Sequence, residues 1–343
     1  MQSEKYSRDN AGQSLKKYTL LKKGELAYNH GASKAKQFGC CYQLEVDEAL
    51  VPFVYHCFSV NKEYAPYIST VLNISTTERQ LKKLVSSSVR MDGLLNISYD
   101  DYMTVELALP SMDEQQKVSC FLSLLEEKIK KQQKLVEHLK KYKRGLLSSL
   151  LDKEEWQTVL MQDVASGFDY GMNSAATEYD GKHKYIRITD IDESTHKYIS
   201  TECVSPSDLP EAKYKVEEND ILFARTGASV GKSYIYDSRD GELYYAGFLI
   251  RASVKPDFNS YFVYLNTLTL GYQRWVVLES TRSGQPGINA EQYRNYKFKC
   301  PPIEIQNKIA NIFIHFDLKL QREQEILDYL LNYKKAMMRN IFV

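Results

Sequence analysis

The chain has 343 residues, of which 43% are hydrophobic and 26% charged, a composition typical of a folded globular protein with room for two domains. A net charge of +1 gives no overall attraction to nucleic acid, so any such site must come from local clusters of basic residues. No apolar run approaches the roughly 20 residues of a membrane span, and the polar N-terminus lacks a signal peptide's apolar stretch, so we expect a cytoplasmic protein without membrane contact. Six cysteines without a CxxC pair indicate reduced thiols.

The first predicted domain covers residues 1–109, and parts of it resemble a later segment. Gly24–Lys34 matches Asp220–Val230 through a shared Gly-Ala-Ser, and Ser87–Tyr102 parallels Glu279–Tyr293 with a register uncertain by one or two residues. Only 23 residues precede Gly24 in the first domain. In the second domain about 65 residues, Trp156–Asn219, precede the matching block that begins at Asp220, so the repeat predicts a first domain that is N-terminally incomplete by about 40 residues. A naturally shortened protein, a moved gene start or structure borrowed from elsewhere would each explain this difference.

Residues 110–153 are predicted to form a long helix. Acidic residues, Asp113 and Glu114, follow Pro110, and a basic cluster lies near the end of the segment, as the helix dipole favours. Apolar residues recur at alternating spacings of three and four, which is typical of the seam of a coiled coil. At about 1.5 Å per residue, roughly 40 residues form a rod on the order of 60 Å long, which indicates a spacer rather than a core element.

Residues 154–300 are predicted to form a second domain of the α+β class. They are rich in Tyr, Val, Ile and Phe and are interrupted by residues that favour turns. The predicted elements are strands at Tyr185–Thr189, Ile221–Thr226 and Ser233–Tyr236, a helical stretch at Tyr261–Leu278 and a polar, glycine-rich loop at Ser280–Ala290.

Residues 301–343 repeat the first long helix at a distance of 191 positions, from Pro110 to Pro301. The apolar positions of the two copies coincide, so the helices are expected to pack against each other. The predicted seam residues are Val118, Leu122, Leu125, Ile129, Gln132, Val136 and Leu139 in the first helix, and Ile309, Phe313, Phe316, Leu320, Glu323, Leu327 and Leu330 in the second.

Gln132 and Glu323 occupy the same heptad position in the two seams. A buried polar pair at this level could fix the register of the helices, and a locally splayed seam accounts for the same residues equally well. The sequence leaves both alternatives open.

The segment Thr226–Ser233, TGASVGKS, ends like a phosphate-binding loop. The Walker pattern requires a glycine five residues before Gly231, where this chain has Thr226. A turn between two strands, in which Gly227 and Gly231 supply backbone freedom, is the better interpretation.

No other motif points to catalysis. The chain lacks a glycine-rich loop after an opening strand, which a dinucleotide or adenosylmethionine site requires, and it lacks the Asn-Pro-Pro-aromatic sequence of an amino-methylating enzyme. Its histidines form no pair at ligand spacing, and its carboxylates do not cluster with a lysine as in a nuclease. The sequence therefore predicts a non-catalytic chain with no cofactor and no metal site of its own.

Basic and amide side chains in predicted loops remain as candidates for function. Arginine can pair bidentately with guanine, glutamine or asparagine with adenine, and lysine or serine with phosphate, so such loops suit DNA sequence readout, although solvated surface has a similar composition. The candidate DNA-binding residues are Asn29, Lys34, Lys36 and Arg90 in the first domain, and Lys182, Lys184, Arg187, Arg225, Thr226, Ser229, Lys232, Arg282, Ser283, Gln285 and Asn289 in the second.

The combined pattern resembles the specificity subunit of type I restriction-modification enzymes over nearly the whole chain. The twin Pro-x-x-x-x-Gln-x-x-Ile/Val helix starts, Pro110–Val118 and Pro301–Ile309, carry the resemblance. Both helices continue to a Tyr-Lys-Lys/Arg segment before a terminal apolar cluster. The Asn-Asp-Ile-Leu-x-x-Arg-x-Gly block at Asn219–Gly227 is similar to the family's recurring target-recognition sequence.

The resemblance implies two target recognition domains, 1–109 and 154–300, each reading one half of a split double-stranded DNA sequence. It also implies that the spacer helices, 110–153 and 301–343, pair as an antiparallel coiled coil. The implied partners are methyltransferase (modification) subunits, which bind S-adenosylmethionine and methylate adenine, and motor-nuclease (restriction) subunits, which use ATP and magnesium to cleave DNA. This chain would supply no catalytic centre to that complex.

The outward faces of the helices would be docking surfaces for the modification subunits, with solvated charge as the alternative. An incomplete first domain would make the protein a silent or recombining variant, or a structural or regulatory adaptor that no longer reads DNA.

Overall fold

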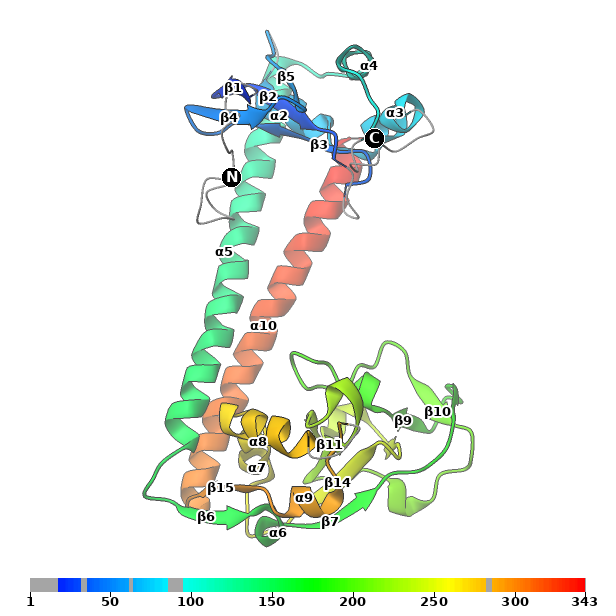
Figure 1. Ribbon diagram of the computed structural model, residues 1–343, viewed down its shortest axis with the longest axis vertical. Coiled ribbons are helices and arrows are strands. Elements are labelled where there is room, and N and C mark those ends of the chain that lie inside the picture. Colours follow the sequence, from blue (N-terminus) through cyan, green and yellow to red (C-terminus); the bar gives the residue numbers. More distant parts are fainter. Residues whose placement is uncertain (1–17, 32–35, 62–63, 86–94, 282–285, 343) are drawn as a thin grey trace. The chain divides into compact units, whose positions relative to one another are not determined.

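The computed structural model describes residues 18–31, 36–61, 64–85, 95–281 and 286–342 (Figure 1). By its internal contacts the chain divides into two units. Unit 1 comprises residues 1–133 and 325–343, and unit 2 comprises residues 134–324. Each unit therefore contains one globular part and one half of each long helix.

Both long helices that the repeat predicted are present. Helix α5 spans Met112–Leu151 and helix α10 spans Ile303–Ile341. Every predicted seam residue on them is buried or half-buried, including the polar Gln132 and Glu323. Most positions between the seam residues are exposed, so each helix buries one stripe and leaves the rest of its surface in water.

Within unit 1 the two helices run antiparallel. The Nζ of Lys334 lies 2.6 Å from Oε1 of Glu126. Val118, which precedes Glu126, packs in the same core as Phe342, which follows Lys334. Rising residue numbers on one helix therefore meet falling numbers on the other.

The helix halves in unit 2 are antiparallel as well. Leu147 and Leu151, near the end of α5, share one core with Ile309 and Phe313, near the start of α10. An ion pair of 2.6 Å between Lys143 Nζ and Asp317 Oδ1 lies further along the pair. The predicted antiparallel pairing of the two helices is confirmed.

Unit 2 is built on a four-stranded antiparallel sheet with the order β12-β11-β14-β7. Its strands are β7 (Ala165–Tyr170), β11 (Asp220–Ala224), β12 (Ser233–Ile235) and β14 (Leu249–Val254). All of β11 is buried, as expected for an apolar strand at the centre of a sheet. Unit 2 also contains three two-stranded sheets: β6 (Gln157–Leu160) with β15 (Lys297–Cys300), β8 (Ala176–Glu178) with β10 (Val204–Pro206), and β9 (Lys184–Ile186) with β13 (Leu243–Tyr245).

The α-helices of the globular part of unit 2 are α6 (Met161–Val164), α7 (Ser260–Asn266), α8 (Leu270–Ser280) and α9 (Ala290–Arg294). Single 3-10 turns lie at Ile188–Asp190, Ala212–Tyr214, Gly227–Ser229 and Ser238–Asp240. The three predicted strands correspond to β9, β11 and β12. The predicted helical stretch is divided into α7 and α8, because the side chain of Thr269 accepts a hydrogen bond from the Tyr272 N–H and begins a new helix.

Unit 1 holds a three-stranded antiparallel sheet with the order β3-β2-β5 and a separate hairpin-like pair, β1 with β4. The strands are β1 (Tyr18–Lys22), β2 (Leu26–Asn29), β3 (Cys40–Gln43), β4 (Glu48–Pro52) and β5 (His56–Phe58). The helices are α2 (Ala65–Val71), α3 (Ser75–Leu84) and α4 (Tyr99–Met103). Both units are thus α+β, in agreement with the predicted fold class.

The two units share a common arrangement of strands and helices. The order β3-β2-β5 in unit 1 corresponds to β12-β11-β14 in unit 2, and the helices α2, α3 and α4 correspond to α7, α8 and α9. In unit 1 the rings of Tyr28 and Tyr102 stack with centroids 4.0 Å apart, and in unit 2 Phe223 and Tyr293 stack at 4.7 Å. The internal repeat therefore extends from the helices into the globular parts.

A matching pair of backbone hydrogen bonds defines the register of this repeat. The N–H of Leu95 donates to the carbonyl of His30, and the N–H of Ile288 donates to the carbonyl of Arg225, both at 2.9 Å. His30 therefore corresponds to Arg225. This register differs by one residue from the shared Gly-Ala-Ser motif, which would place His30 opposite Thr226.

The two units differ at one edge of the sheet. In unit 2, β7 pairs with the outer side of β14. Among the residues that the structure describes in unit 1, no strand pairs with β5 in the corresponding way. The described part of the first domain is thus the smaller of the two.

The twin glutamines of the two helix starts have the same contacts. Gln306 is buried, its Oε1 accepts a hydrogen bond of 3.0 Å from the N–H of Asn259, and its Nε2 donates to the carbonyl of Pro301 at 2.8 Å. In unit 1, Gln115 Oε1 accepts from the N–H of Tyr64 at 3.1 Å, and its Nε2 donates to the carbonyl of Pro110 at 3.0 Å. Each glutamine therefore joins the start of a long helix to the start of a helix in its own globular part.

The TGASVGKS segment forms the turn between β11 and β12, as predicted. Gly227 and Gly231 have φ angles of +74° and +83°, which a residue with a side chain rarely adopts. A Cβ on Gly231 would lie 2.5 Å from the side chain of Val276, so the turn is also packed closely against α8. The glycines serve the fold, and nothing in this turn requires a nucleotide.

Candidate nucleic-acid interface

Arg225 follows the buried strand β11 and lies where two loops of unit 2 meet. Its N–H donates to the carbonyl of Phe248 at 3.0 Å, and its carbonyl accepts from the N–H of Ile288 at 2.9 Å. The next residue, Thr226, pairs with Gly287 in an isolated β-bridge. The backbone of Arg225 is therefore held by the loop before β14 and by the described end of the predicted glycine-rich loop.

The guanidinium of Arg225 is held by an aromatic ring. Its central carbon lies 4.7 Å from the centroid of Tyr170, whose hydroxyl accepts a hydrogen bond of 3.2 Å from the N–H of Ala290. Among the described residues, the buried Nε of Arg225 has no hydrogen-bond partner. A cation–π contact orients a guanidinium without engaging its N–H groups, and the structure shows no hydrogen bond from the terminal nitrogens of Arg225 to a described residue, so these terminal donors remain for an acceptor such as guanine or phosphate.

Two exposed aromatic residues beside Arg225 were not predicted from the sequence. Tyr170 is 42% exposed and ends β7, and Phe248 is 57% exposed in the turn before β14. Exposed aromatic rings next to an arginine are suited to contacts with bases and sugars. The chain separates both from Arg225, so no local sequence pattern could have grouped them.

Two other predicted DNA-binding side chains have internal partners. Lys232 is only 8% exposed as a whole residue. Its Nζ lies 2.9 Å from the carbonyl of Ile191 and 2.5 Å from Oε1 of Glu193. Arg187 donates two hydrogen bonds of 2.8 Å to Asp190, and this contact raises the pKa of the guanidinium. Because Lys232 and Arg187 already donate hydrogen bonds to these partners, DNA binding through either side chain would require these contacts to break.

Most of the remaining described candidates form hydrogen bonds within the fold. Internal hydrogen bonds hold Lys184 to the carbonyl of Asp240, Lys36 to the carbonyl of Asn73, Ser229 to Glu193, Asn29 to the N–H of Gly31, and Asn289 to the N–H of Gln292 at the start of α9. Lys182 is exposed. Lys34, Arg90, Arg282, Ser283 and Gln285 lie outside the described residues. The DNA-binding roles of all these residues stay predictions.

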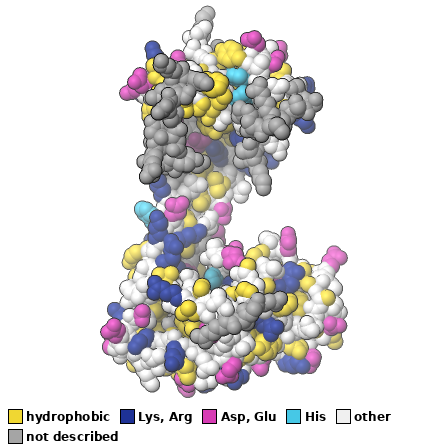
Figure 2. Space-filling view, in the orientation of Figure 1, with side chains coloured by type: hydrophobic (Ala, Val, Ile, Leu, Met, Phe, Trp, Pro, Cys, Tyr) yellow, Lys and Arg dark blue, Asp and Glu magenta, His cyan; other side chains and the backbone are white. Residues whose placement is uncertain are grey.

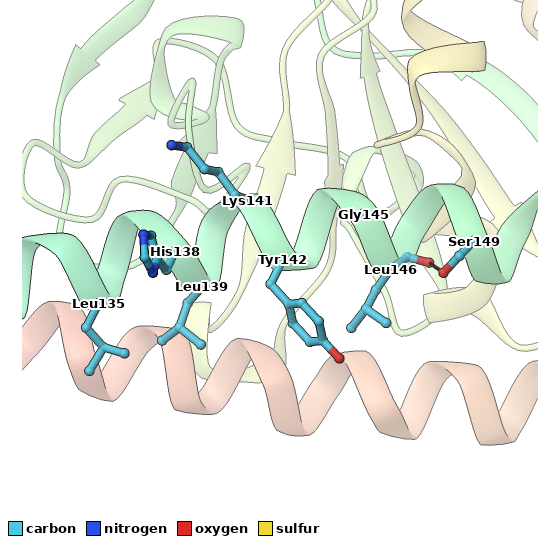
Figure 3. A pocket seen from close by; sticks show the side chains of 8 residues that line it. All are labelled: Leu135, His138, Leu139, Lys141, Tyr142, Gly145, Leu146 and Ser149. Carbon is cyan, nitrogen blue, oxygen red and sulfur yellow. Dashed lines mark hydrogen bonds between the residues drawn. The ribbon is translucent and has the colours of Figure 1, made fainter.

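A groove of about 720 Å³ follows the part of α5 that belongs to unit 2 (Figure 3). It is lined by Leu135, His138, Leu139, Lys141, Tyr142, Gly145, Leu146 and Ser149. Figure 3 shows Leu139, Tyr142 and Leu146 pointing toward α10, whereas Lys141 points away from it. Tyr142 remains 61% exposed although its ring centroid lies 5.8 Å from that of Phe316. An exposed apolar strip of this kind is typical of a contact site for another protein.

A second cavity of unit 2, of about 610 Å³, is lined in part by a half-buried histidine, His196. Its Nδ1–H donates to the carbonyl of Ser233 at 2.9 Å. Burial lowers the pKa of His196, and the nearby cations of Lys232 and Lys143 lower it further, whereas the hydrogen bond to the Ser233 carbonyl and the carboxylate of Glu193 oppose this shift without reversing it. The imidazole is therefore neutral in the fold at a pH where an unfolded histidine already takes up a proton.

Acidification is expected to weaken unit 2 through His196. Below the ordinary histidine pKa of about 6.5 the unfolded chain binds a proton that the folded chain resists, so the free energy of unfolding falls between about pH 7 and pH 5. His196→Asn will show a smaller decline over this range, because asparagine tolerates the φ of +56° at this position and does not titrate. Urea titrations at several pH values measure both slopes, and equal slopes would contradict the assignment.

The described part of the chain contains neither a metal-binding cluster nor a helix suited to span a membrane. No group of three or more His, Cys, Asp or Glu residues there could hold a metal ion. Of the helices described, none combines the length and apolarity that crossing a membrane requires.

Comparison with known proteins decides the family. Residues 153–332, just over half of the chain, match the model of the type I restriction modification DNA specificity domain. The chain belongs to this family. The matched DNA specificity domain begins two residues after α5 ends, contains the globular part of unit 2 with Arg225, and continues along most of α10.

Two curated relatives come from Methanocaldococcus jannaschii. The specificity subunit assigned to the type I restriction enzyme MjaX is 25% identical over 198 residues, covering 55% of this chain and 46% of the relative. The type I restriction enzyme MjaVIII specificity subunit is 24% identical over 168 residues, covering 47% and 38%. The chain thus matches less than half the length of these relatives. Both are specificity subunits, a non-catalytic class, and the prediction that this chain is not an enzyme agrees with that class.

Two solved structures share the fold. The S subunit of a type I restriction-modification system from M. genitalium has a TM-score of 0.56 and 14% identity, with 96% of this chain and 85% of that chain covered. A chain from a study of complex assembly and conformational transition of the type I R-M system has the same TM-score and identity, with 94% and 83% covered. Both units and both long helices of this specificity-domain protein are therefore part of a known fold.

Proposed function

We propose that the protein is the specificity subunit of a type I restriction-modification complex and reads a bipartite double-stranded DNA target. One observation carries the proposal: the same strand and helix arrangement occurs twice, and its second copy lies within a DNA specificity domain. Two domains of the same architecture are suited to bind the two parts of a bipartite DNA target. Arg225 and Tyr170 supply the oriented donors and exposed ring that base readout needs.

The proposed partners are modification and restriction subunits, which would bring S-adenosylmethionine, ATP and magnesium to the complex. The apolar groove around Tyr142 on α5 supports docking of another protein at the helices. The protein would act in the cytoplasm, together with these subunits and the DNA that they modify or cleave.

The decisive experiment is selection of bound duplexes from a randomised DNA pool, with the full chain alone and with a modification subunit. We expect an enriched sequence with two specified parts separated by an unspecified gap, and co-elution of the modification subunit in size-exclusion chromatography. A single enriched half-site would mean that only one domain reads DNA.

A structural or regulatory adaptor is the second candidate function, because the described part of unit 1 lacks a counterpart of β7. Co-elution with the modification subunit without any enriched sequence would favour the adaptor over the reader. Absence of both co-elution and enrichment would refute both functions.

A further inference from the structure

The two long helices repeat each other in their seams but differ in charge. Residues 128–144 of α5 contain eight basic residues and one acidic residue, whereas the equivalent residues 319–335 of α10 contain four basic and three acidic residues. Pairing of the helices does not require this difference, because the seam side chains are mainly apolar. The excess of positive charge on α5 therefore needs another explanation.

Part of this basic segment is used within the fold. Lys131 pairs with Glu127 at 2.6 Å, and Lys143 pairs with Asp317 of α10 at the same distance. In contrast, the structure shows no ionic partner among the described residues for the four exposed cations of α5 in unit 2. We call these the basic stripe: Lys134, Lys140, Lys141 and Arg144.

The basic stripe lies along one side of the helix. Lys134, Lys141 and Arg144 are separated by seven and three residues, spacings that place them on a common face, with Lys140 beside them. Glu137 is the acidic residue on this face. Figure 2 shows Lys and Arg side chains gathered over the C-terminal half of α5. Figure 3 shows Lys141 directed away from Tyr142 and from α10, although Lys141 also lines the edge of the apolar groove.

We propose that the basic stripe binds the phosphate backbone of double-stranded DNA without reading its sequence. The stripe extends from Lys134 to Arg144, or about 15 Å of helix, and one DNA strand carries a phosphate every 3.4 Å or so, so the stripe can face about four phosphates. Mobile lysine ammonium groups suit phosphate contacts, which position a protein on DNA but carry no base information. This inference rests on the proposed DNA-reading function and adds to it a contact surface outside the recognition loops.

The experiment measures binding of a labelled random-sequence duplex to the full chain at several salt concentrations. In the variant Lys134→Gln, Lys140→Gln, Lys141→Gln, Arg144→Gln, we expect the slope of log affinity against log salt to become shallower by about 3 to 4, since each lost phosphate contact removes roughly 0.9. We also expect an affinity loss of about tenfold or more at low salt.

A matched variant on α10 distinguishes the loss of the basic stripe from a mere decrease in net charge. Lys319→Gln, Arg322→Gln, Lys335→Gln, Arg339→Gln removes the same number of exposed positive charges, and its salt slope should stay near that of the unmodified chain. Thermal unfolding of both variants verifies that the fold is intact. Equal slopes for the α5 variant and the unmodified chain, or equal losses in both variants, would overturn the proposal.

Other outcomes separate this inference from the proposed function. If the α5 variant keeps its salt slope but no longer co-elutes with the modification subunit, the stripe binds an acidic protein surface and not DNA. If the unmodified chain, alone and with the modification subunit, binds no duplex at any salt concentration, DNA reading itself fails, and this inference fails with it.

Discussion

Gln306→Ala will lower the free energy of unfolding of unit 2 by about 2 to 6 kcal/mol. The substitution leaves the N–H of Asn259 and the carbonyl of Pro301 without their partner, and each buried or half-buried backbone group that loses a hydrogen bond costs about 1 to 3 kcal/mol. Urea unfolding followed by tryptophan fluorescence measures the effect, because both tryptophans of the chain, Trp156 and Trp275, lie in unit 2.

Two further variants make this test specific. Gln306→Glu keeps the acceptor for Asn259 but cannot donate to Pro301 while it is ionised, so its loss should be large at neutral pH and smaller in acid. Gln116→Ala, at an exposed position of α5, should change stability by less than about 0.5 kcal/mol. A loss for Gln306→Ala no greater than that of Gln116→Ala would show that the glutamine does not join α10 to α7.

Arg225→Ala will weaken binding to the selected DNA sequence by about 1 to 3 kcal/mol, roughly 5- to 150-fold, and will relax the preference at one base position. The physical reason is that the fold orients the guanidinium on Tyr170, while the structure shows no hydrogen bond from its terminal nitrogens to a described residue. Competition binding with duplexes that carry single base changes measures both effects.

The controls for Arg225 distinguish base readout from phosphate contact. Arg225→Lys keeps the charge but loses the two-pronged donor geometry, so it should retain affinity only if the contact is to phosphate. Arg239→Ala removes an exposed arginine that pairs with Asp237 and should leave DNA binding unchanged. A uniform loss on all duplexes for Arg225→Ala would assign Arg225 to the DNA backbone.

Several features of the protein were predicted from the sequence because they depend on local patterns. The heptad spacing of apolar residues predicts α5 and α10, and the 191-residue repeat predicts that they are equivalent. The apolar run at Ile221 and the two glycines after it predict β11 and its turn. The resemblance of the whole pattern also pointed to the family that the comparison establishes.

The sequence could not tell which basic residues are free to bind DNA. Lys232 and Arg225 are both basic residues beside the same turn, and composition alone treats them alike. The fold buries the amine of Lys232 against Ile191 and Glu193, whereas it lays Arg225 on a ring from another strand. Burial and partner choice depend on side chains that are distant in sequence, and no local pattern encodes them.

The sequence by itself determined the repeat, the two long helices, the α+β class and the family resemblance, because periodicity and spacing are properties of neighbouring residues. Only the tertiary structure decided the roles of particular side chains. Gln115 and Gln306 could be recognised as a repeated motif, but their contacts lie 51 and 47 residues away along the chain. Hydrogen bonds and ion pairs of this kind arise only when packing brings separate segments together, so they can be assigned only once the fold is known.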